Sequence, residues 1–168
     1  QIRTTSQWMM IYLCTTGNAM LPKYFEDIQK YVNIIKFSIY GVNPEVYKKT
    51  MGGLSHEKSM RNINQFLEMD VEKKVYTVGN FIKMPENQHE IQDWINLWKP
   101  HNYIDGRKYR DISNKKQTTC GRPLEGPLNI AVNGKAHVCC FDYNKLLVVG
   151  DTKTMTLNEI MNSKEMKH

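Results

Sequence analysis

Three short apolar stretches that alternate with amphipathic segments constrain the fold of this chain more than any other feature. Each stretch has the length and composition of a strand, and together they cover residues 8–14, 34–39 and 74–82. Helical periodicity follows each one, with helices expected from Pro22 onward, over residues 44–50 and 57–69, and after Asn87. This alternation predicts right-handed βαβ units and a parallel sheet, whose ligands gather at the carboxyl ends of the strands.

Capping patterns predict where two of the helices begin. Asn87 and Glu90 have the spacing of a capping box ahead of an apolar helix face, and Glu86 is interpreted as helix-capping as well. Thr156 and Glu159 make a second box, which opens the last helix of the chain. The tyrosine and tryptophan side chains fall on apolar helix faces, so we expect them in the core.

Charge and cysteine usage narrow the class of protein. The 168 residues carry a net charge of +6, but the 23 basic residues are scattered. We interpret the one modest basic cluster as a solvated loop, with contact to a polyanion as the alternative: Arg107, Lys108, Arg110, Lys115 and Lys116. No apolar run approaches the roughly 18 residues that a membrane helix needs. Four cysteines, two of them adjacent, make a poor disulfide framework and indicate a reducing cytoplasm.

A cysteine-flanked hairpin is predicted in the last third of the chain. Residues 128–132 and 135–139 form the two strands around Asn133-Gly134, which is typical of a type I′ turn. Cys139 lies at the exit of the hairpin and Cys120 lies upstream of its entry. If the chain folds back so that these two thiolates become neighbours, they suit a soft metal or an iron–sulfur cluster.

Each thiol also has a second interpretation. Cys120 and Cys139 are cluster ligands in one interpretation and free or oxidised thiols in the other. Cys140 is the third ligand candidate, although adjacent side chains of an extended strand, such as those of Cys139 and Cys140, point to opposite faces. His137 faces the same side as Cys139 and is either a substitute ligand or an exposed hairpin residue. Cys14, at the end of the first predicted strand, is expected to be a small buried core residue.

The end of the chain resembles a known iron–sulfur module. The spacing Cys120-x13-Gly134-x4-Cys139, the doubled cysteine, Asp142 and the stretches VVGD and TLNEIMNS look like a SPASM domain. This is the auxiliary iron–sulfur module at the C-terminal end of many radical S-adenosylmethionine (SAM) enzymes. The resemblance implies that Cys120, Cys139 and Cys140 are metal ligands.

The first part of the chain is similar to the second half of a radical SAM barrel. LCTTG at residues 13–17, FSIYG at 37–41 and MPENQHEIQDW resemble successive strand ends of that fold, and HNYIDGR at 101–107 resembles the linker into the auxiliary domain. The predicted fold is therefore α/β, with a partial parallel βα barrel over residues 1–104 and a hairpin-plus-helix SPASM-like module over 105–168. The resemblance implies that Thr15, Thr16 and Ser38 line the SAM side of the barrel mouth, with Thr16 in place of the usual Asn.

One departure from the family decides what activity to expect. Radical SAM enzymes hold a [4Fe–4S] cluster with a Cys-x3-Cys-x2-Cys loop, and reductive cleavage of SAM there gives a 5′-deoxyadenosyl radical. This chain has no such loop. We expect an internal fragment of a longer enzyme or a degenerate relative, inactive by itself, with a [4Fe–4S] cluster and SAM belonging to the intact member and no catalytic residue assigned here. The alternative is a non-catalytic module that binds metal or a partner.

The expected partners follow from this architecture. A half barrel leaves an unpaired strand edge, so self-association through the first strand is predicted. The intact enzyme is expected to modify a peptide, a protein or another substrate that the residues do not identify, and neither a membrane nor a nucleic acid is the expected partner.

Overall fold

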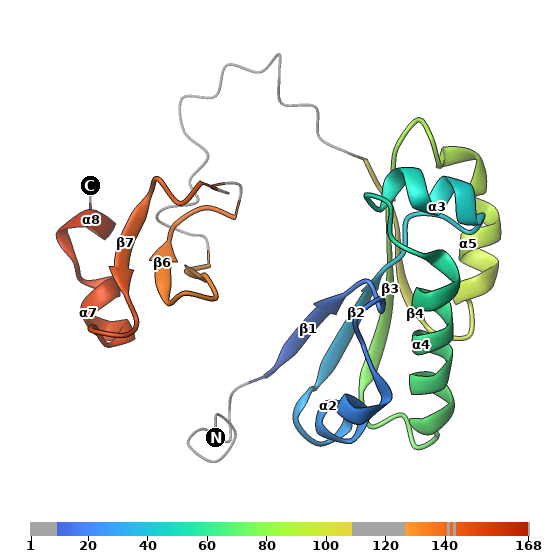
Figure 1. Cartoon of the computed structure of the whole chain (residues 1–168), viewed down its shortest axis with the longest axis horizontal. Helices are drawn as coiled ribbons and strands as arrows, with labels where there is room; N and C mark the ends of the chain where they lie inside the picture. The colour runs from blue at the N-terminus through green and yellow to red at the C-terminus, as the bar shows by residue number, and fades with distance from the viewer. Residues whose placement is uncertain (1–9, 109–126, 141, 143, 168) are drawn as a thin grey trace. The chain divides into compact units, whose positions relative to one another are not determined.

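A computed structural model describes residues 10–108, 127–140, 142 and 144–167 of the chain (Figure 1). The chain divides into two compact units, Gln1–Asp111 and Ile112–His168. The domain boundary predicted after residue 104 falls inside a strand of the first unit. In the part of the chain that the model describes, no helix is long and apolar enough to cross a bilayer.

The first unit contains a four-stranded parallel sheet in the order β1-β2-β3-β4. Its strands are β1 (Tyr12–Thr15), β2 (Ile34–Ser38), β3 (Tyr76–Lys83) and β4 (Asn102–Lys108). The first three confirm the predicted strands. The fourth was predicted only as a linker, because its sequence is polar and its strand conformation depends on pairing with β3.

Helices connect these strands, as the periodicity predicts. They are η1 (Pro22–Tyr24), α2 (Phe25–Tyr31), α3 (Pro44–Thr50), α4 (His56–Met69), η2 (Gln88–Glu90) and α5 (Ile91–Trp98). The Asn43 side chain accepts a hydrogen bond from the backbone N–H of Glu45 at the start of α3, and Ser55 accepts one from Lys58 at the start of α4. These two caps satisfy N–H groups that a helix start leaves without an intrahelical partner.

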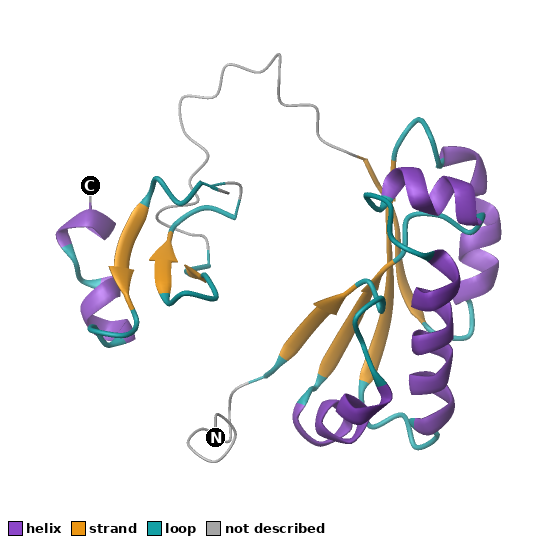
Figure 2. Cartoon of the chain, in the orientation of Figure 1, coloured by secondary structure: helices purple, strands orange, loops and turns teal. Residues whose placement is uncertain are grey.

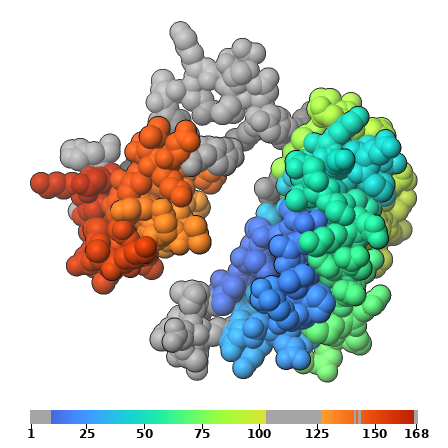
Figure 3. Space-filling view, viewed as in Figure 1, coloured from blue at the N-terminus to red at the C-terminus, as the bar shows by residue number. Residues whose placement is uncertain are grey.

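The helices of the first unit gather on one face of the sheet (Figure 2). On that face Ile35, Phe37 and Phe81 are fully buried and belong to one core with Phe66 and Trp98. In the space-filling view the atoms of α4 lie beside those of α2 on the visible face of this unit (Figure 3). Along β1, β2 and β3 the alternation of side chains therefore assigns the odd-numbered positions to the helix face and the even-numbered ones to the opposite, open face. This open face is exposed at Tyr12 and Cys14 of β1, whereas Val78 and Asn80 of β3 are buried on it.

The prediction that Cys14 is a buried core residue is wrong, because Cys14 is exposed. It lies on the open face of β1 together with Tyr12, which is 48% exposed, whereas Leu13 between them packs against the core. The apolar run of the strand was correctly identified, but burial of both faces requires a second layer. Among the described residues no helix supplies that layer.

Strand β1 is an edge of this sheet, and the predicted self-association through it stays a prediction. Tyr12 lies on the edge strand beside Lys36, whose ammonium is 5.5 Å from the Tyr12 ring centre. A charge placed here should prevent strand pairing between two copies, so Tyr12→Glu should be monomeric in light scattering where the unmodified chain associates. Tyr24→Glu, at an exposed tyrosine outside the sheet, is the matched control. A chain that stays monomeric at all concentrations would contradict the prediction.

The second unit is a three-stranded antiparallel sheet followed by two short helices. The elements are β5 (Asn129–Ile130), β6 (Lys135–His137), β7 (Val148–Asp151), α7 (Leu157–Met161) and α8 (Lys164–Lys167). Ala136, Val149 and Ile160 form its buried core. The Thr156 and Glu159 capping box is confirmed, since each side chain bonds the backbone N–H of the other residue.

The hairpin between β5 and β6 is confirmed, but its turn is not type I′. Gly134 has φ +89°, whereas Asn133 is not in the left-handed region that a type I′ turn requires. The Gly134 N–H donates to the Ala131 carbonyl (2.8 Å), and the Ala131 N–H donates to the Lys135 carbonyl (2.9 Å). These bonds define a three-residue loop that ends in a left-handed glycine, the second common hairpin geometry.

Candidate functional site

The carboxyl edge of the sheet holds the three residues predicted to line the SAM side, and their contact with SAM stays a prediction. Thr15 ends β1 and Thr16 follows it, and their hydroxyls accept hydrogen bonds from the backbone N–H groups of Gly17 (3.1 Å) and Asn18 (3.4 Å). Both hydroxyls therefore stabilise their own turn. Ser38 ends β2 on the open face of the sheet, in register with Asn80 of β3. Its hydroxyl makes no hydrogen bond within the described residues, so it is the member of the three best placed to contact a ligand.

Two further residues of this edge were missed in the sequence. The Asn80 side-chain amide donates to the Tyr40 hydroxyl at 3.2 Å, and Asn80 is only 4% exposed. Ser38, Tyr40 and Asn80 thus form a polar row on the open face, at the carboxyl ends of β2 and β3. An asparagine in the apolar stretch of β3 was the available signal, because polar residues inside a buried strand need a partner or a ligand.

Asn87 and Glu90 do not form the predicted capping box. The buried Asn87 side chain accepts from the Met84 N–H (2.7 Å) and donates to the carbonyls of Tyr40 (2.8 Å) and Ile82 (2.9 Å). It makes no capping bond to the helix that follows. The interpretation as a helix cap is therefore wrong, because a carbonyl of the loop after β2 and one of strand β3 accept from the amide instead.

The Glu90 carboxylate also binds the loop after β2. It accepts hydrogen bonds from the backbone N–H groups of Val42 (2.8 Å) and Asn43 (3.1 Å). Asn43 in turn caps α3. Charge-assisted bonds of this kind are stronger than neutral ones, so Glu90 and Asn87 together fix the segment that carries Tyr40.

A histidine packs against helix α3, which follows this loop. The ring of His56, at the start of α4, is 5.1 Å from the ring of Tyr47, and its Nε2 is buried with no hydrogen-bond partner in the described part of the chain. Burial lowers the pKa of His56, and the negative charge of Glu90 opposes that shift. A neutral imidazole avoids placing a second charge in this packed region.

The loop after β1 is held by α4. The Asn62 side-chain amide donates to the carbonyls of Gly17 (2.9 Å) and Asn18 (3.3 Å), while the Asn18 side chain donates to the Ser59 hydroxyl (3.3 Å). Gly17 itself has φ +75°, a conformation that favours glycine. The loops after β1 and β2 are therefore both held by side-chain hydrogen bonds, the first to α4 and the second to Asn87 and Glu90.

The second candidate site is the turn that follows β6. Strand β6 ends at His137, so Cys139, half-buried, and Cys140, exposed, lie in the turn beyond it. A ring nitrogen of His137 is 2.9 Å from the Cys139 carbonyl oxygen, and the Asp142 N–H donates to that same carbonyl. Nδ1 of His137 is therefore engaged by the turn itself, which leaves Nε2 as the nitrogen that a metal could take, and the role of His137 as a substitute ligand stays a prediction.

Asp142 organises the rest of this turn. Its carboxylate accepts hydrogen bonds from the backbone N–H groups of Leu147 (2.8 Å) and Leu146 (2.9 Å), and these bonds lower the pKa of Asp142. Stabilisation of the charged form by N–H donors explains the direction of the shift. These bonds tie Asp142 to the start of the segment that leads into β7.

The described residues do not complete an iron–sulfur site. A four-iron cluster takes four ligands, usually thiolates, and no group of three or more His, Cys, Asp or Glu side chains comes together among the residues described. Cys120, the predicted partner of Cys139, lies outside the described residues. The three predicted metal ligands therefore stay a prediction that the geometry does not test.

Comparison with known proteins bears on both units. Residues 120–168 match the family model of SPASM, an iron–sulfur cluster-binding domain. The chain carries a SPASM domain. This match confirms the resemblance drawn from the cysteine spacing. The curated proteins contain no significant match to the sequence.

The fold of the chain is similar to a solved structure of polyhistidine-tagged anSMEcpe with bound AdoMet. The TM-score is 0.65 with 11% sequence identity, and the match covers 93% of this chain and 55% of that chain. This chain therefore spans about half the length of the structure that it matches. At this level of identity the likeness shows the fold, and it confirms the predicted α/β class with a parallel βα sheet ahead of the SPASM domain.

Proposed function

We propose that this chain contributes the SAM side of a barrel mouth and an auxiliary iron–sulfur module to a radical SAM enzyme. One observation carries the proposal. A SPASM domain follows in sequence on a parallel βα sheet whose fold matches that of an AdoMet-bound protein. Fold likeness alone would not support a function, but a cluster-binding family match in the same chain points to iron–sulfur chemistry.

The polar row supplies the ligand contacts in this proposal. Ligands of parallel βα sheets bind at the carboxyl ends of the strands, which is where Ser38, Tyr40 and Asn80 lie. A hydroxyl, a phenol and an amide offer donors and acceptors that suit the ribose and amino-acid groups of SAM. When bound at a reduced cluster, SAM supplies the radical that abstracts hydrogen from the substrate. Asn87 and Glu90 keep the Tyr40 loop in place for that contact.

The radical-generating cluster is not held by residues of this chain. The four cysteines of the chain are Cys14, Cys120, Cys139 and Cys140, and none of them belongs to a Cys-x3-Cys-x2-Cys loop. In the proposal this chain by itself generates no radical, and its SPASM domain relays electrons or docks the substrate. The same observation favours the second candidate, a non-catalytic module that keeps the scaffold and binds metal or a partner.

Iron content tests the cluster part of the proposal. After anaerobic reconstitution with iron and sulfide, the chain should be brown and contain both, and Cys139→Ser and Cys120→Ser should lose most of the iron because each removes a thiolate ligand. Cys14→Ser is the matched control, since Cys14 lies exposed on β1 of the other unit, and should retain the iron. A colourless chain that takes up zinc instead would favour the non-catalytic module. Equal iron loss in all three variants would contradict the assignment of ligands.

A further inference from the structure

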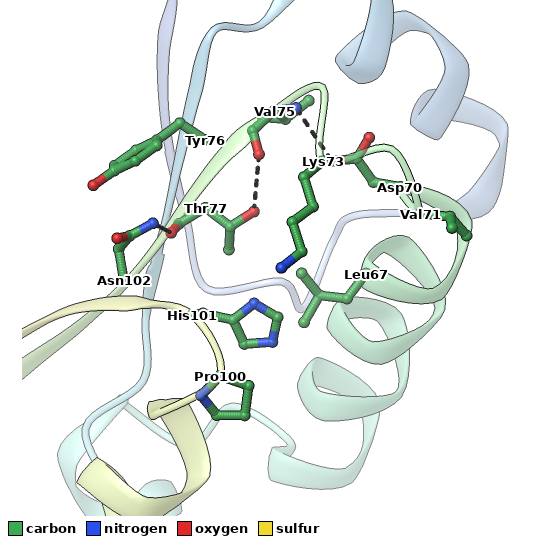
Figure 4. A pocket seen from close by; sticks show the side chains of 10 residues that line it. All are labelled: Leu67, Asp70, Val71, Lys73, Val75, Tyr76, Thr77, Pro100, His101 and Asn102. Atoms are coloured by element: carbon green, nitrogen blue, oxygen red, sulfur yellow. Dashed lines mark hydrogen bonds between the residues drawn. The ribbon is translucent and has the colours of Figure 1, made fainter.

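A pocket of about 230 Å³ lies at the opposite end of the sheet from the polar row (Figure 4). It is formed by the end of α4, the connection from α4 to β3, the first residues of β3 and the connection from α5 to β4. Leu67, Val71, Val75 and Pro100 give it apolar walls. The polar side chains of Lys73, Thr77, His101 and Asn102 line the same space. This pocket takes no part in the proposed radical chemistry.

The pocket contains both a cation and a carboxylate, which do not form an ion pair with each other. Lys73 forms no ion pair with the residues that the structure describes, whereas its neighbour Lys74 pairs with Glu72 at 2.9 Å. The pocket also contains the buried carboxylate of Asp70, but both of its oxygens are occupied. Oδ1 accepts from the Gln29 side chain (2.8 Å) and the Lys74 N–H (3.1 Å), and Oδ2 accepts from the Val75 N–H (3.1 Å).

The backbone at Lys73 is strained. Its φ is +50°, in the left-handed region that favours glycine, and its N–H closes a turn onto the Asp70 carbonyl (2.9 Å). A lysine at such a position costs stability that a glycine would not. Figure 4 shows the Lys73 side chain extending from this turn into the pocket, toward His101 and Leu67. An outlier of this kind justifies a hypothesis about what the side chain does.

His101 lies in the same pocket as Lys73 and is affected by its positive charge. Its ring packs edge-on against Trp98, with ring centres 5.9 Å apart. Burial lowers the pKa of His101, and the positive charge of Lys73 lowers it further. The imidazole is therefore neutral at neutral pH and offers one ring N–H as a donor, beside the ammonium of Lys73 and the hydroxyl of Thr77.

We propose that this pocket binds the carboxylate of a small organic acid, with the Lys73 ammonium as its charged partner and the apolar walls around its carbon chain. One ammonium matches the single negative charge of a carboxylate. The carboxylate belongs either to a free monocarboxylic acid or to the C-terminus of a peptide. Both have the same charged group, and the volume admits a chain of a few carbon atoms.

Titration with hexanoate tests this proposal on the full chain. In ¹H–¹⁵N spectra at constant ionic strength, hexanoate should shift the backbone signals of Thr77 and Asn102 in a saturable manner, and uncharged hexanamide should not. An N-acetylated dipeptide with a free C-terminus and its C-terminal amide form the second pair of probes. Saturation by the peptide acid at lower concentration than hexanoate would identify a peptide terminus as the ligand, and the reverse order would identify a free acid.

Lysine variants supply the matched control. Lys73→Gln should weaken hexanoate binding by at least about tenfold because it removes the unpaired charge, whereas Lys74→Gln should stay within about twofold. Lys73→Arg retains the charge and should still bind, which separates loss of the ligand contact from misfolding. Equal weakening in Lys73→Gln and Lys74→Gln, or the same shifts with sodium chloride alone, would overturn the proposal.

Discussion

Replacing Asn87 with alanine should lower the free energy of unfolding of the first unit by about 3 kcal/mol. The substitution deletes one acceptor and two donors from a side chain that is fully buried. It leaves the Met84 N–H and the Ile82 carbonyl without this partner, while the Tyr40 carbonyl keeps the bond from the Thr50 hydroxyl (3.0 Å). An unsatisfied buried polar group costs about 1–3 kcal/mol, and solvent entry at the loops recovers part of the sum.

Urea unfolding followed by tryptophan fluorescence measures this loss, because Trp94 and Trp98 are buried in the same unit. The matched control is Glu86→Ala, one residue away and exposed, which should change stability by less than about 0.5 kcal/mol. If the two variants unfold at the same urea concentration, Asn87 is not the link between the loops that the hydrogen bonds indicate.

Asn87 also shows where sequence reasoning stops. The pattern Asn-x-x-Glu is local and correctly marks a helix that begins nearby. Which N–H and carbonyl groups the two side chains contact depends on a loop more than 40 residues earlier in the chain. The Asn87 side chain could bond either to the start of the following helix or to carbonyls of other segments. It bonds to those carbonyls because a buried carbonyl without a hydrogen bond is costly.

The alternation of strands and helices was predictable because it depends on the local periodicity of apolar residues. The helix expected over residues 44–50 has those bounds, and α4 begins one residue earlier than predicted. Strand β4 could not be found in this way, since its register comes from pairing with β3. The exposure of Cys14 was likewise invisible, because it depends on what covers the open face of the sheet.

The candidate site was predictable in position but not in detail. The carboxyl edge followed from the topology of parallel sheets and Ser38 from the family resemblance, whereas the partnership of Tyr40 with Asn80 required the register of β2 against β3. The cysteine turn was found from spacing alone, and the family match on residues 120–168 agrees with it. The pocket around Lys73 had no sequence signal, because its strained backbone and its unpaired charge are properties of the folded chain.

Replacing Gly79 with alanine should be the more damaging of the two changes, with a loss of about 3 kcal/mol or more. A Cβ at this position would lie 2.5 Å from Cδ2 and 2.7 Å from Cε3 of the Trp98 ring. The ring has no room to retreat, since it also packs against Phe37 and Trp94, each with ring centres 6.0 Å away. Close-packed cores respond to an added methyl group by shifting rigid neighbours, which is costly.

The steric origin of this loss can be separated from backbone effects. Gly52→Ala meets no atom within 4 Å but has φ +63°, so it should lose only about 1 kcal/mol from its left-handed backbone. In the Gly79→Ala background, Trp98→Leu should cost far less than it costs alone, because a smaller side chain admits the new methyl group. Strictly additive losses in that double-mutant cycle would show that Gly79 and Trp98 do not meet.

Because Trp98 also packs against His101, Gly79→Ala should disturb the pocket that contains Lys73 while Gly52→Ala leaves it intact.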